Sequence, residues 1–333
     1  MRYPIQQSIR IASYLAKQKR SKRERYPLVT MLEPLHTCNL TCTGCGRIRE
    51  YSTHLSQRLT LEQCLKAVRE SDTPIVSVCG GEPLIYPEID ELIAALLDDK
   101  RVVYLCTNAM FVPKHIDRWK PSPYFNVNVH LDGMEKTHDL VVEKQGVFQE
   151  AVAAIKLLKS RGFTVCTNTT VYAETDPAEI EELFTFLTAL GVDGLLISPG
   201  FDYVAVADKR FFLTRDMIKE KFRAIHAFAS KFRLWSTPKY LAFLAGERDY
   251  DCTPWANVTY NIKGWKGPCY LITDGHYITF DELMESTNWD YYEKRIDPRC
   301  ENCMVHCGYE ASAQRETTKS IKDSLQMLWW TLT

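Results

Sequence analysis

The amino-acid sequence predicts an α/β protein built on a sheet of parallel strands. Two observations carry this prediction: six short β-rich runs follow one another between about residues 28 and 200, and stretches with helical periodicity separate them. A repeated order of strand and then helix favours parallel strands joined by right-handed crossovers. Six such units could close into an incomplete barrel or form a doubly wound sheet, and periodicity does not choose between these folds.

The strand candidates are short runs bounded by turns. They are residues 29–35, 74–80, 101–106, 125–131, 163–171 and 193–198. Apolar residues recur at helical spacing between them, for example in 148–158 and 180–190. In either fold the carboxyl ends of parallel strands meet at one edge of the sheet. Polar residues at those ends are therefore where we expect chemistry.

The alternation stops at about residue 201. Residues 212–232 and 238–246 are predicted helices, and a Gly-, Pro- and Trp-rich region with several cysteines follows them to about residue 313. We expect this part to be a second, smaller unit that is held by ligands rather than by a large core.

The composition is that of an ordinary soluble globular protein. The chain has 333 residues, of which 45% are hydrophobic and 25% are charged. A formal net charge of −1 gives no reason to expect nucleic acid as a partner. The sequence has no apolar run long enough to span a membrane, and its start lacks the features of a signal peptide. We therefore expect a cytoplasmic protein.

Twelve cysteines are the unusual feature of the composition. Eight of them fall into two groups, which are 38, 42, 45 and 252, 269, 300, 303, 307. Clustered thiols in a large chain without an export signal indicate metal or iron–sulfur ligands rather than disulfides. The isolated cysteines, for which burial is the default interpretation, are Cys64, Cys79, Cys106 and Cys166.

The first group, Cys38, Cys42 and Cys45, has the spacing C-x₃-C-x₂-C. A structural zinc site needs four ligands, and no fourth cysteine or histidine follows at a suitable distance; His36 precedes the group at a spacing that is not typical of zinc. Three thiolates around a [4Fe–4S] cluster leave one iron open, and an open iron can bind a substrate. The spacing therefore predicts such a cluster in the loop after the first strand.

The end of the second strand supports this prediction. There Cys79 is followed by Gly80, Gly81, Glu82 and Pro83. Two glycines let the backbone approach a ligand closely, the glutamate supplies negative charge, and the proline stiffens the turn. Alone this segment indicates only a turn. One strand–helix unit after the cysteine motif, it becomes specific support for the predicted cluster site.

These motifs together resemble the radical S-adenosylmethionine (SAM) superfamily over roughly residues 28–200. The resemblance implies a partial (β/α)₆ barrel whose [4Fe–4S] cluster binds the amino and carboxylate groups of SAM at its open iron. The fourth ligand would then be the cosubstrate. It also implies that the segment from Gly80 to Pro83 contacts the methionyl amino group.

The resemblance assigns further SAM contacts and shows two departures. Thr107 and Asn108 match a recurring Thr-Asn at the end of the third strand, whereas Asn168 and Ser198 are weaker candidates for ribose and adenine contacts. The departures are His130, where a serine is usual, and Gly44, where many members carry an aromatic residue.

Segments along nearly the whole chain resemble the hopanoid-biosynthesis branch of that superfamily. The implied reaction adds a 5′-deoxyadenosyl radical to the terminal alkene of the hopene diploptene, with a flavodoxin- or ferredoxin-type electron donor. A tertiary carbon radical results, and the resemblance implies that the Cys106 thiol quenches it with a hydrogen atom. Cys79, at an equivalent strand end, is the competing donor, but it lies directly before the turn expected to contact SAM.

The second group of cysteines resembles the twitch and SPASM extensions of radical SAM enzymes. Eleven residues separate Cys252 from Gly264, and four more precede the next cysteine. The resemblance implies an auxiliary [4Fe–4S] cluster, and we expect one, because five cysteines are too few for two full clusters. Its expected ligands are Cys252, Cys269, Cys300 and Cys303, with Cys307 as the alternative; zinc at the same sulfurs stays open.

The two ends of the chain suggest peripheral contact with the inner face of a membrane. Ile5, Ile9, Ala12 and Leu15 form one helical face before the basic run 17–25, which suits an interfacial helix attracted to anionic lipid. The tail adds apolar and interfacial side chains at Leu325, Leu328, Trp329, Trp330 and Leu332. A helix packed on the barrel and a solvated charge run explain the same patterns equally well.

The sequence thus divides into four parts: an amphipathic, basic segment (1–27), the radical SAM barrel (28–200), a helical and cysteine-rich extension (201–313) and an amphipathic tail (314–333). Two other functions share these features. A SPASM-type peptide-modifying enzyme would carry most of the motifs, and an iron–sulfur electron-transfer or binding protein would carry the cysteines without cleaving SAM.

Overall fold

A curved nine-stranded sheet organises the computed structural model, which describes residues 2–317 and 319–332. The strand order is β6-β5-β4-β3-β2-β1-β7-β8-β9. The first six strands are parallel and follow chain order without a reversal, whereas a doubly wound sheet reverses its order at a switch point. The sheet is therefore the incomplete barrel rather than the doubly wound alternative.

All six predicted strands are confirmed. They are β1 (Val29–Leu32), β2 (Ile75–Val78), β3 (Val102–Thr107), β4 (Phe125–His130), β5 (Thr164–Val171) and β6 (Gly194–Pro199). Strands β7 (Asn257–Asn261), β8 (Gly264–Pro268) and β9 (Thr273–Tyr277) complete the sheet. Strand β7 pairs in parallel with β1, and the last three strands form an antiparallel meander.

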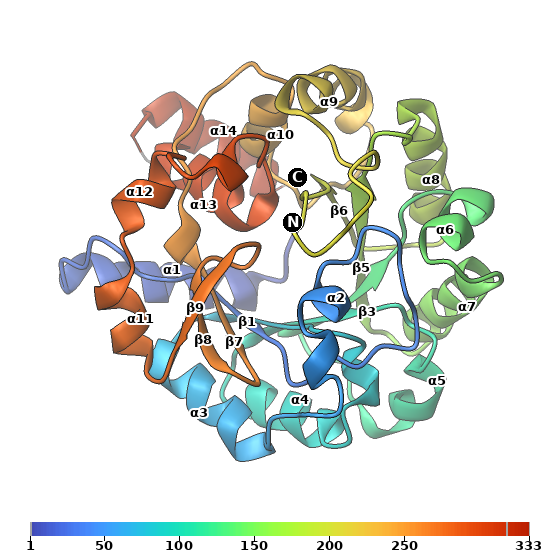
Figure 1. The fold of residues 1–333 in the computed structure, drawn as a ribbon. Coiled ribbons are helices and arrows are strands. Elements are labelled where there is room, and N and C mark those ends of the chain that lie inside the picture. The colour runs from blue at the N-terminus through green and yellow to red at the C-terminus, as the bar shows by residue number, and fades with distance from the viewer. Residues whose placement is uncertain (1, 318, 333) are drawn as a thin grey trace.

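Most helices lie around the outside of the barrel in Figure 1, whereas the short α2 (Arg47–Glu50) lies within that ring, in front of the barrel. Those between barrel strands are α2 (Arg47–Glu50), α3 (Leu61–Ser71), α4 (Ile89–Asp98), α5 (Val112–His115), α6 (Glu135–Val141), α7 (Val147–Ser160) and α8 (Pro177–Ala189). The others are α1 (Ile5–Arg20), α9 (Arg215–Ala229), α10 (Pro238–Leu244), α11 (Phe280–Ser286), α12 (Trp289–Glu293), α13 (His306–Thr317) and α14 (Ile321–Leu332). Short 3₁₀ turns lie at Ser52–His54, Pro83–Ile85, Ile116–Arg118, Pro254–Ala256 and Pro298–Cys300.

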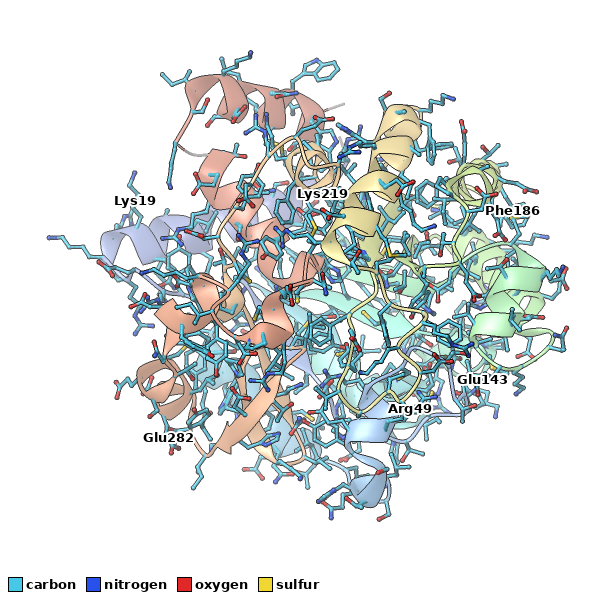
Figure 2. All side chains as sticks on the ribbon, turned by 45° about the horizontal axis from the view of Figure 1, so that its top comes forward. Lys19, Arg49, Glu143, Phe186, Lys219 and Glu282 are labelled. Carbon is cyan, nitrogen blue, oxygen red and sulfur yellow. The ribbon has the colours of Figure 1, made fainter. Side chains whose placement is uncertain are left out.

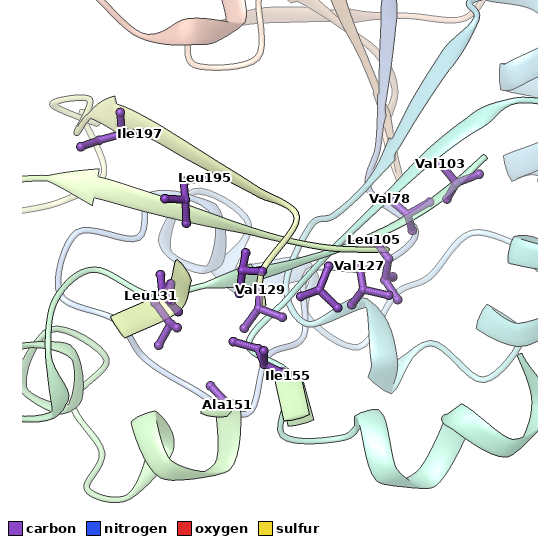
Figure 3. Close-up of a cluster of buried hydrophobic side chains, with 14 of the residues drawn as sticks. Val78, Val103, Leu105, Val127, Val129, Leu131, Ala151, Ile155, Leu195 and Ile197 are labelled. Atoms are coloured by element: carbon purple, nitrogen blue, oxygen red, sulfur yellow. The ribbon is translucent and has the colours of Figure 1, made fainter. Parts of the chain in front are cut away.

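The main hydrophobic core lies between the strands and these outer helices. Figure 3 shows Leu105, Val127 and Val129 facing Ala151 and Ile155 of α7, and all five side chains are buried. Alternate strand residues point the other way, because successive side chains of a strand face opposite sides of the sheet.

The inner face of the barrel carries polar and thiol side chains. Ser77, Cys106, Asn128 and Cys166 lie on it, on four neighbouring strands. Bulky branched side chains dominate the interior of a closed (β/α)₈ barrel, which is a packed core. The interior of this open barrel is instead lined for hydrogen bonding and thiol chemistry.

The C-terminal part differs from the expected small unit held by ligands. Strands β7, β8 and β9 continue the barrel sheet beyond β1, and the main core includes Tyr240, Leu244, Met304 and Tyr309 from the C-terminal part. The expectation of a unit without a large core was therefore wrong. Strand β8 could not be predicted from the sequence, because its residues GWKGP include two glycines and a proline, which are unusual in strands.

Candidate active site

The three N-terminal cysteines lie in the loop that follows β1, at the carboxyl edge of the sheet. Cys38, Cys42 and Cys45 are all partly exposed. Arg49 holds the loop by donating hydrogen bonds to the carbonyl oxygens of Cys42 (2.9 Å) and Cys45 (2.6 Å). Glu143 accepts hydrogen bonds from two threonine side chains of the same loop. Figure 2 labels Arg49 and Glu143 beside this loop. The loop is thus fixed from two sides.

The donor set of this loop fits a [4Fe–4S] cluster. Burial raises the pKa of Cys38 to about 11, and burial together with the two neighbouring thiols raises that of Cys42 well above its usual range. Three thiols therefore lie near one another in a partly buried loop, where iron would favour their ionised form. Among residues 2–317 and 319–332, no three Cys, His, Asp or Glu side chains lie close enough together to hold a single metal ion. This does not conflict with a [4Fe–4S] cluster, because its thiolates bind separate irons and lie farther apart.

The Gly-Gly-Glu-Pro turn packs directly against the segment that leads to Cys38. Gly81 N–H donates to the Leu35 carbonyl (3.0 Å), and Glu82 N–H donates to the Thr37 carbonyl (2.9 Å). A Cβ at Gly80 would lie 2.3 Å from the Leu35 carbonyl oxygen, and one at Gly81 would lie 2.0 Å from the Thr37 carbonyl oxygen. Only glycine fits at either position, and Gly80 also has a φ of +110°.

The Glu82 carboxylate joins the ends of β2 and β3. It is 1% exposed and accepts hydrogen bonds from Thr107 Oγ1 (2.7 Å), Leu84 N (3.0 Å) and Asn108 N (2.9 Å). Burial raises its pKa to about 7, against the opposite effect of these hydrogen bonds. Both oxygens are thus engaged by the protein. The expected contact of this turn with SAM stays a prediction.

Asn108 lies beside the cysteine loop, as a residue at the end of β3 should. Its Nδ2 donates to Asn39 Oδ1 at 2.8 Å, and Asn39 directly follows Cys38. The Asn39 side chain in turn donates to the sulfur of Met110 at 3.1 Å. The structure therefore brings the predicted Asn108 and the first cysteine of the motif together.

Cys106 faces the barrel interior between β2 and β4. Its sulfur lies 3.3 Å from Ser77 Oγ and accepts a hydrogen bond from Asn128 Nδ2 at 3.5 Å. Burial raises the pKa of the Cys106 thiol, although these two hydrogen bonds lower it. Cys79, on the neighbouring strand end, is 7% exposed, and burial raises its pKa as well. Both thiols therefore keep their protons at neutral pH.

His130 stands where the resemblance expects a serine, and it forms an ion pair with Asp132 (2.7 Å). Burial lowers the pKa of His130, but Asp132 outweighs this effect, so the net shift is upward. Asn168 lies opposite His130 in the register of β4 and β5, at the same edge of the barrel. Asn168 is therefore placed among the other predicted site residues.

Ser198 lies at the end of β6 but is engaged elsewhere. It is 5% exposed, its hydroxyl lies 3.2 Å from the Tyr240 hydroxyl, and it accepts a hydrogen bond from His306 N at 3.3 Å. These contacts join β6 to α10 and α13. No hydrogen bond among the described residues links Ser198 to the cysteine loop, and its role as an adenine contact stays a prediction.

Two tyrosines that the sequence analysis did not single out pack on the glycines of the cysteine loop. A Cβ at Gly44 would lie 2.5 Å from the Tyr172 hydroxyl oxygen, and one at Gly46 would lie 2.2 Å from the Tyr203 ring. Tyr172 directly follows β5, so its ring occupies the space beside Gly44, where the resemblance expects an aromatic side chain. The sequence did contain a signal for Tyr172. It is an aromatic residue directly after a strand, in a chain whose cysteine loop carries Gly44 where an aromatic residue is expected.

Arg47 connects the cysteine loop to the C-terminal part. It is 4% exposed, its Nη2 donates to the Tyr270 carbonyl (2.6 Å), and its guanidinium lies over the Tyr270 ring. Its Nη1 is 3.9 Å from Glu33, which also pairs with His36 at 3.2 Å. His36 is thus a buried partner of Glu33 rather than a fourth ligand beside the cysteines.

All five C-terminal cysteines line one cavity. It is surrounded by Cys252, Cys269, Cys300, Cys303 and Cys307 together with Tyr270 and apolar side chains. The volume of the cavity is about 490 Å³ when its part open to solvent is included. This thiol-rich, apolar surrounding fits an auxiliary [4Fe–4S] cluster. A Cβ at Gly308 would lie 2.4 Å from Cys252 Sγ, so a side chain here would displace that sulfur. Which four of the five sulfurs bind a cluster stays a prediction.

Known proteins share parts of this sequence. Residues 32–187 match the radical SAM superfamily, and residues 195–327 match a domain of unknown function (DUF3463). The AdoMet-dependent heme synthase of Methanosarcina barkeri is 29% identical over 158 residues, which are 46% of this chain and 45% of that protein. The mycofactocin maturase MftC of Mycobacterium tuberculosis is 25% identical over 169 residues, 50% of this chain and 43% of that protein. The chain thus spans less than half the length of these relatives.

A solved structure shares the fold over most of the chain. Streptococcus suis SuiB bound to its precursor peptide SuiA superposes with a TM-score of 0.65 and 14% identity, covering 93% of this chain and 77% of that one. The radical SAM superfamily uses a [4Fe–4S] cluster and SAM, and SuiB has also been solved with SAM bound. Residues 32–187 are therefore similar in sequence to radical SAM domains, and the barrel with its cysteine loop agrees with that match.

Proposed function

We propose that this chain is a radical SAM enzyme that joins a 5′-deoxyadenosyl group to the hopene diploptene, the reaction of adenosylhopane synthases. The observation that supports it is the Cys106 thiol, held inside the barrel by Ser77 and Asn128. A thiol at this place suits a reaction that ends on a carbon radical in need of a hydrogen atom. When bound, the [4Fe–4S] cluster and SAM supply a 5′-deoxyadenosyl radical.

In this proposal the loop residues Cys38, Cys42 and Cys45 hold the cluster. The turn from Gly80 to Pro83 lies along the methionine part of SAM, and Asn108 and Asn168 contact its remaining polar groups. The packing of that turn on residues 35–37 supports this arrangement, because it fixes the two glycines beside the cysteine loop. Ser198 is included as an adenine contact.

Cys106 completes the proposed reaction. Addition of the adenosyl carbon to the terminal CH₂ of diploptene forms a C–C bond and leaves a tertiary carbon radical on the substrate. Cys106 donates a hydrogen atom to that carbon, so that an S–H bond breaks, a C–H bond forms and a thiyl remains. One electron from a flavodoxin- or ferredoxin-type donor and one proton then restore the thiol. Burial keeps the S–H form available by raising the pKa of Cys106.

The test is anaerobic incubation of the iron-loaded protein with SAM, dithionite and diploptene, followed by mass spectrometry. The proposal expects an adduct with the mass of diploptene plus a deoxyadenosyl group and one hydrogen. Release of methionine and 5′-deoxyadenosine without this adduct would retain the radical SAM chemistry and reject the hopene substrate. Absence of both would favour an iron–sulfur electron-transfer or binding protein.

A SPASM-type peptide-modifying enzyme is the second candidate. It is favoured by the fold shared with SuiB, which was solved with a precursor peptide, and by the similarity to a maturase. This candidate expects SAM cleavage that diploptene leaves unchanged and no lipid adduct. The same assay therefore separates the two candidates.

A further inference from the structure

Helix α14 presents its apolar face to solvent. Its buried residues are Asp323, Met327 and Trp330. The opposite side exposes large apolar side chains, with 84% of Ile321, 62% of Leu325, 56% of Leu328, 67% of Trp329 and 54% of Leu332 accessible. A surface helix ordinarily turns its apolar stripe to the core and its polar face to water. Helix α14 instead buries two apolar residues and exposes its other large apolar side chains.

Polar contacts hold α14 to the body in this orientation. Asp323 pairs with Lys239 (2.5 Å) and Arg248 (2.9 Å), and Gln326 accepts a hydrogen bond from Lys239 (2.6 Å). An ion-pair network thus anchors the inward side of the helix, beside the buried apolar side chains of Met327 and Trp330. The outward apolar stripe is a consequence of that anchoring.

Helix α1 shows a similar arrangement. Gln7, Tyr14 and Gln18 are buried on its inner side, where Gln7 Nε2 donates to Asn126 Oδ1 (3.1 Å) and Tyr14 donates to the Pro27 carbonyl (2.6 Å). Ile5 and Ile9, which are 49% and 61% exposed, lie on the side that faces away. The helix thus packs on the barrel, as one interpretation of the sequence pattern expected, but it does so through Gln7, Tyr14 and Gln18 and leaves these isoleucines exposed.

The two helices meet where the chain begins and ends, and Figure 1 marks both ends close together. Arg2 N–H donates to the Thr331 carbonyl (2.9 Å), and the rings of Tyr3 and Trp330 are 6.1 Å apart. The exposed side chains of α1 and α14 thus belong to neighbouring elements. The apolar surface is defined by Ile5, Ile9, Leu15, Ile321, Leu325, Leu328, Trp329 and Leu332.

Positive charge follows this surface along the chain. Lys17, Lys19 and Arg20 occupy the last turn of α1, and Lys22 and Arg23 follow; all five are exposed. Figure 2 shows Lys19 extending from α1 into solvent. Apolar side chains beside a basic run are the combination that binds an anionic bilayer, because the first insert among the acyl chains and the second attract the headgroups.

We propose that α1 and α14 form a peripheral docking surface for an anionic lipid bilayer. The inference deepens the proposed function and rests on it for the reason that the protein would bind a membrane, since diploptene is a hydrocarbon of the bilayer. The surface itself follows from exposure and charge. No helix of the described chain is long and apolar enough to cross a membrane, so the contact would be interfacial.

Flotation of the full, iron-loaded chain with vesicles tests this proposal without any hopene. We expect binding to vesicles of equal parts phosphatidylglycerol and phosphatidylcholine, and weaker binding to phosphatidylcholine alone. L325Q with L328Q should weaken binding roughly tenfold or more, since two inserted leucines are lost. K19Q with R20Q should weaken it on anionic vesicles and reduce its salt dependence there, since three of the five basic residues remain.

L140Q with I278Q is the matched control, because these apolar residues are 67% and 82% exposed elsewhere on the molecule. The control should bind as the unchanged protein does, with the same iron content and melting temperature. Equal binding by all variants, or equal loss in the control, would overturn the proposal. So would a lipid-free dimer that L325Q with L328Q converts to monomer, because the surface would then be covered by a second copy. SAM cleavage measured in parallel keeps this result separate from the proposed function.

Discussion

Cys106 and Cys79 differ at the scale of single residues although they lie on neighbouring strands. Cys106 is partly exposed toward the barrel interior and receives a directed hydrogen bond from Asn128. Cys79 is buried directly before the Gly-Gly-Glu-Pro turn. A hydrogen-atom donor must reach the substrate radical from one fixed direction, which favours the more accessible and better oriented thiol.

Replacing Cys106 by alanine should separate the two chemical steps of the proposed reaction. The iron content and SAM cleavage should stay unchanged, because neither involves that thiol. The adenosylated product should fall several-fold and contain both configurations at the new centre, since hydrogen would come from solvent or reductant on either face. Chiral chromatography of the adduct with 5′-deoxyadenosine quantification measures both effects.

The buried thiol Cys166 on β5 is the matched control for this variant, because it also faces the barrel interior. Cys166→Ala should keep a single stereoisomer. If Cys106→Ala gave the same isomer at the same yield, Cys106 would be a packing residue and Cys79 would become the leading donor.

Residues whose role follows from a local sequence motif could be predicted from the sequence. Residues whose role depends on a contact with a distant part of the chain could not. The cysteine spacing and the paired glycines reflect local needs of a cluster loop and a tight turn. Tyr172 and Arg47 contact partners that are 128 and 223 positions away, namely Gly44 and Tyr270. One sequence shows no such pairing, because it depends on which strand ends the fold brings together.

At the scale of elements, the turn after β2 depends on the absence of side chains. A methyl group at Gly81 would lie 2.0 Å from the Thr37 carbonyl oxygen, which is backbone and cannot rotate away. Gly81→Ala should therefore displace the turn, weaken SAM binding at least tenfold by equilibrium dialysis and leave the iron content nearly unchanged. Gly275→Ala, with nothing within 4 Å of its added methyl, is the control. Equal loss of iron and SAM binding would make the turn a purely structural element.

Helix α14 should depend on one carboxylate. Hydrogen bonds from Lys239 and Arg248 lower the pKa of Asp323 below its ordinary value of 3.8. The stability that Asp323 gives to the packing of α14 on the rest of the protein is therefore fully present above about pH 3.8, and it is lost as the pH falls through the lowered pKa. Asp323→Ala should speed amide exchange throughout residues 321–332 at neutral pH, whereas the exposed Lys322→Ala should not. Unchanged exchange in Asp323→Ala would show that apolar packing at Met327 and Trp330 suffices.

The elements of the barrel were predictable because their pattern is strong. Each of β1 to β6 is buried against an outer helix, which selects runs of β-branched residues. Strand β8 escaped prediction because its partners, rather than its own residues GWKGP, make it a strand. The outward apolar face of α14 also needed the structure, since periodicity gives a stripe but not its direction.

At the scale of the whole molecule, one sheet joins the two cysteine sites. Strand β1, which leads into the first site, pairs with both β2 and β7, and the hairpin after β7 leads to Cys269. Arg47 adds a direct contact between the two loops. The sites are therefore parts of a single folded body, although their ligands should bind independently.

Anaerobically reconstituted protein should contain about eight irons per chain, four for each [4Fe–4S] cluster, and no zinc. Cys38→Ala should lose about half of the iron and all SAM cleavage. Cys252→Ala should lose a similar amount of iron and retain SAM cleavage, while the isolated, buried Cys64→Ala should lose neither. Elemental analysis with Mössbauer spectroscopy measures the content; about four irons in the unchanged protein would exclude an auxiliary cluster.

The polar lining of the barrel sets a limit on how this protein can be stabilised. Asn128 Oδ1 and Thr259 Oγ1 are buried, and neither has a hydrogen-bond partner within residues 2–317 and 319–332. An unpaired buried polar group costs about 1–3 kcal/mol, so leucine at position 128 or valine at position 259 should raise the melting temperature. The change at position 128 would also remove the hydrogen bond to Cys106, the thiol on which the proposed reaction depends. Selection for heat resistance alone would therefore drift toward robust but inactive variants, and a thermostabilised form is better sought among residues outside the barrel lining.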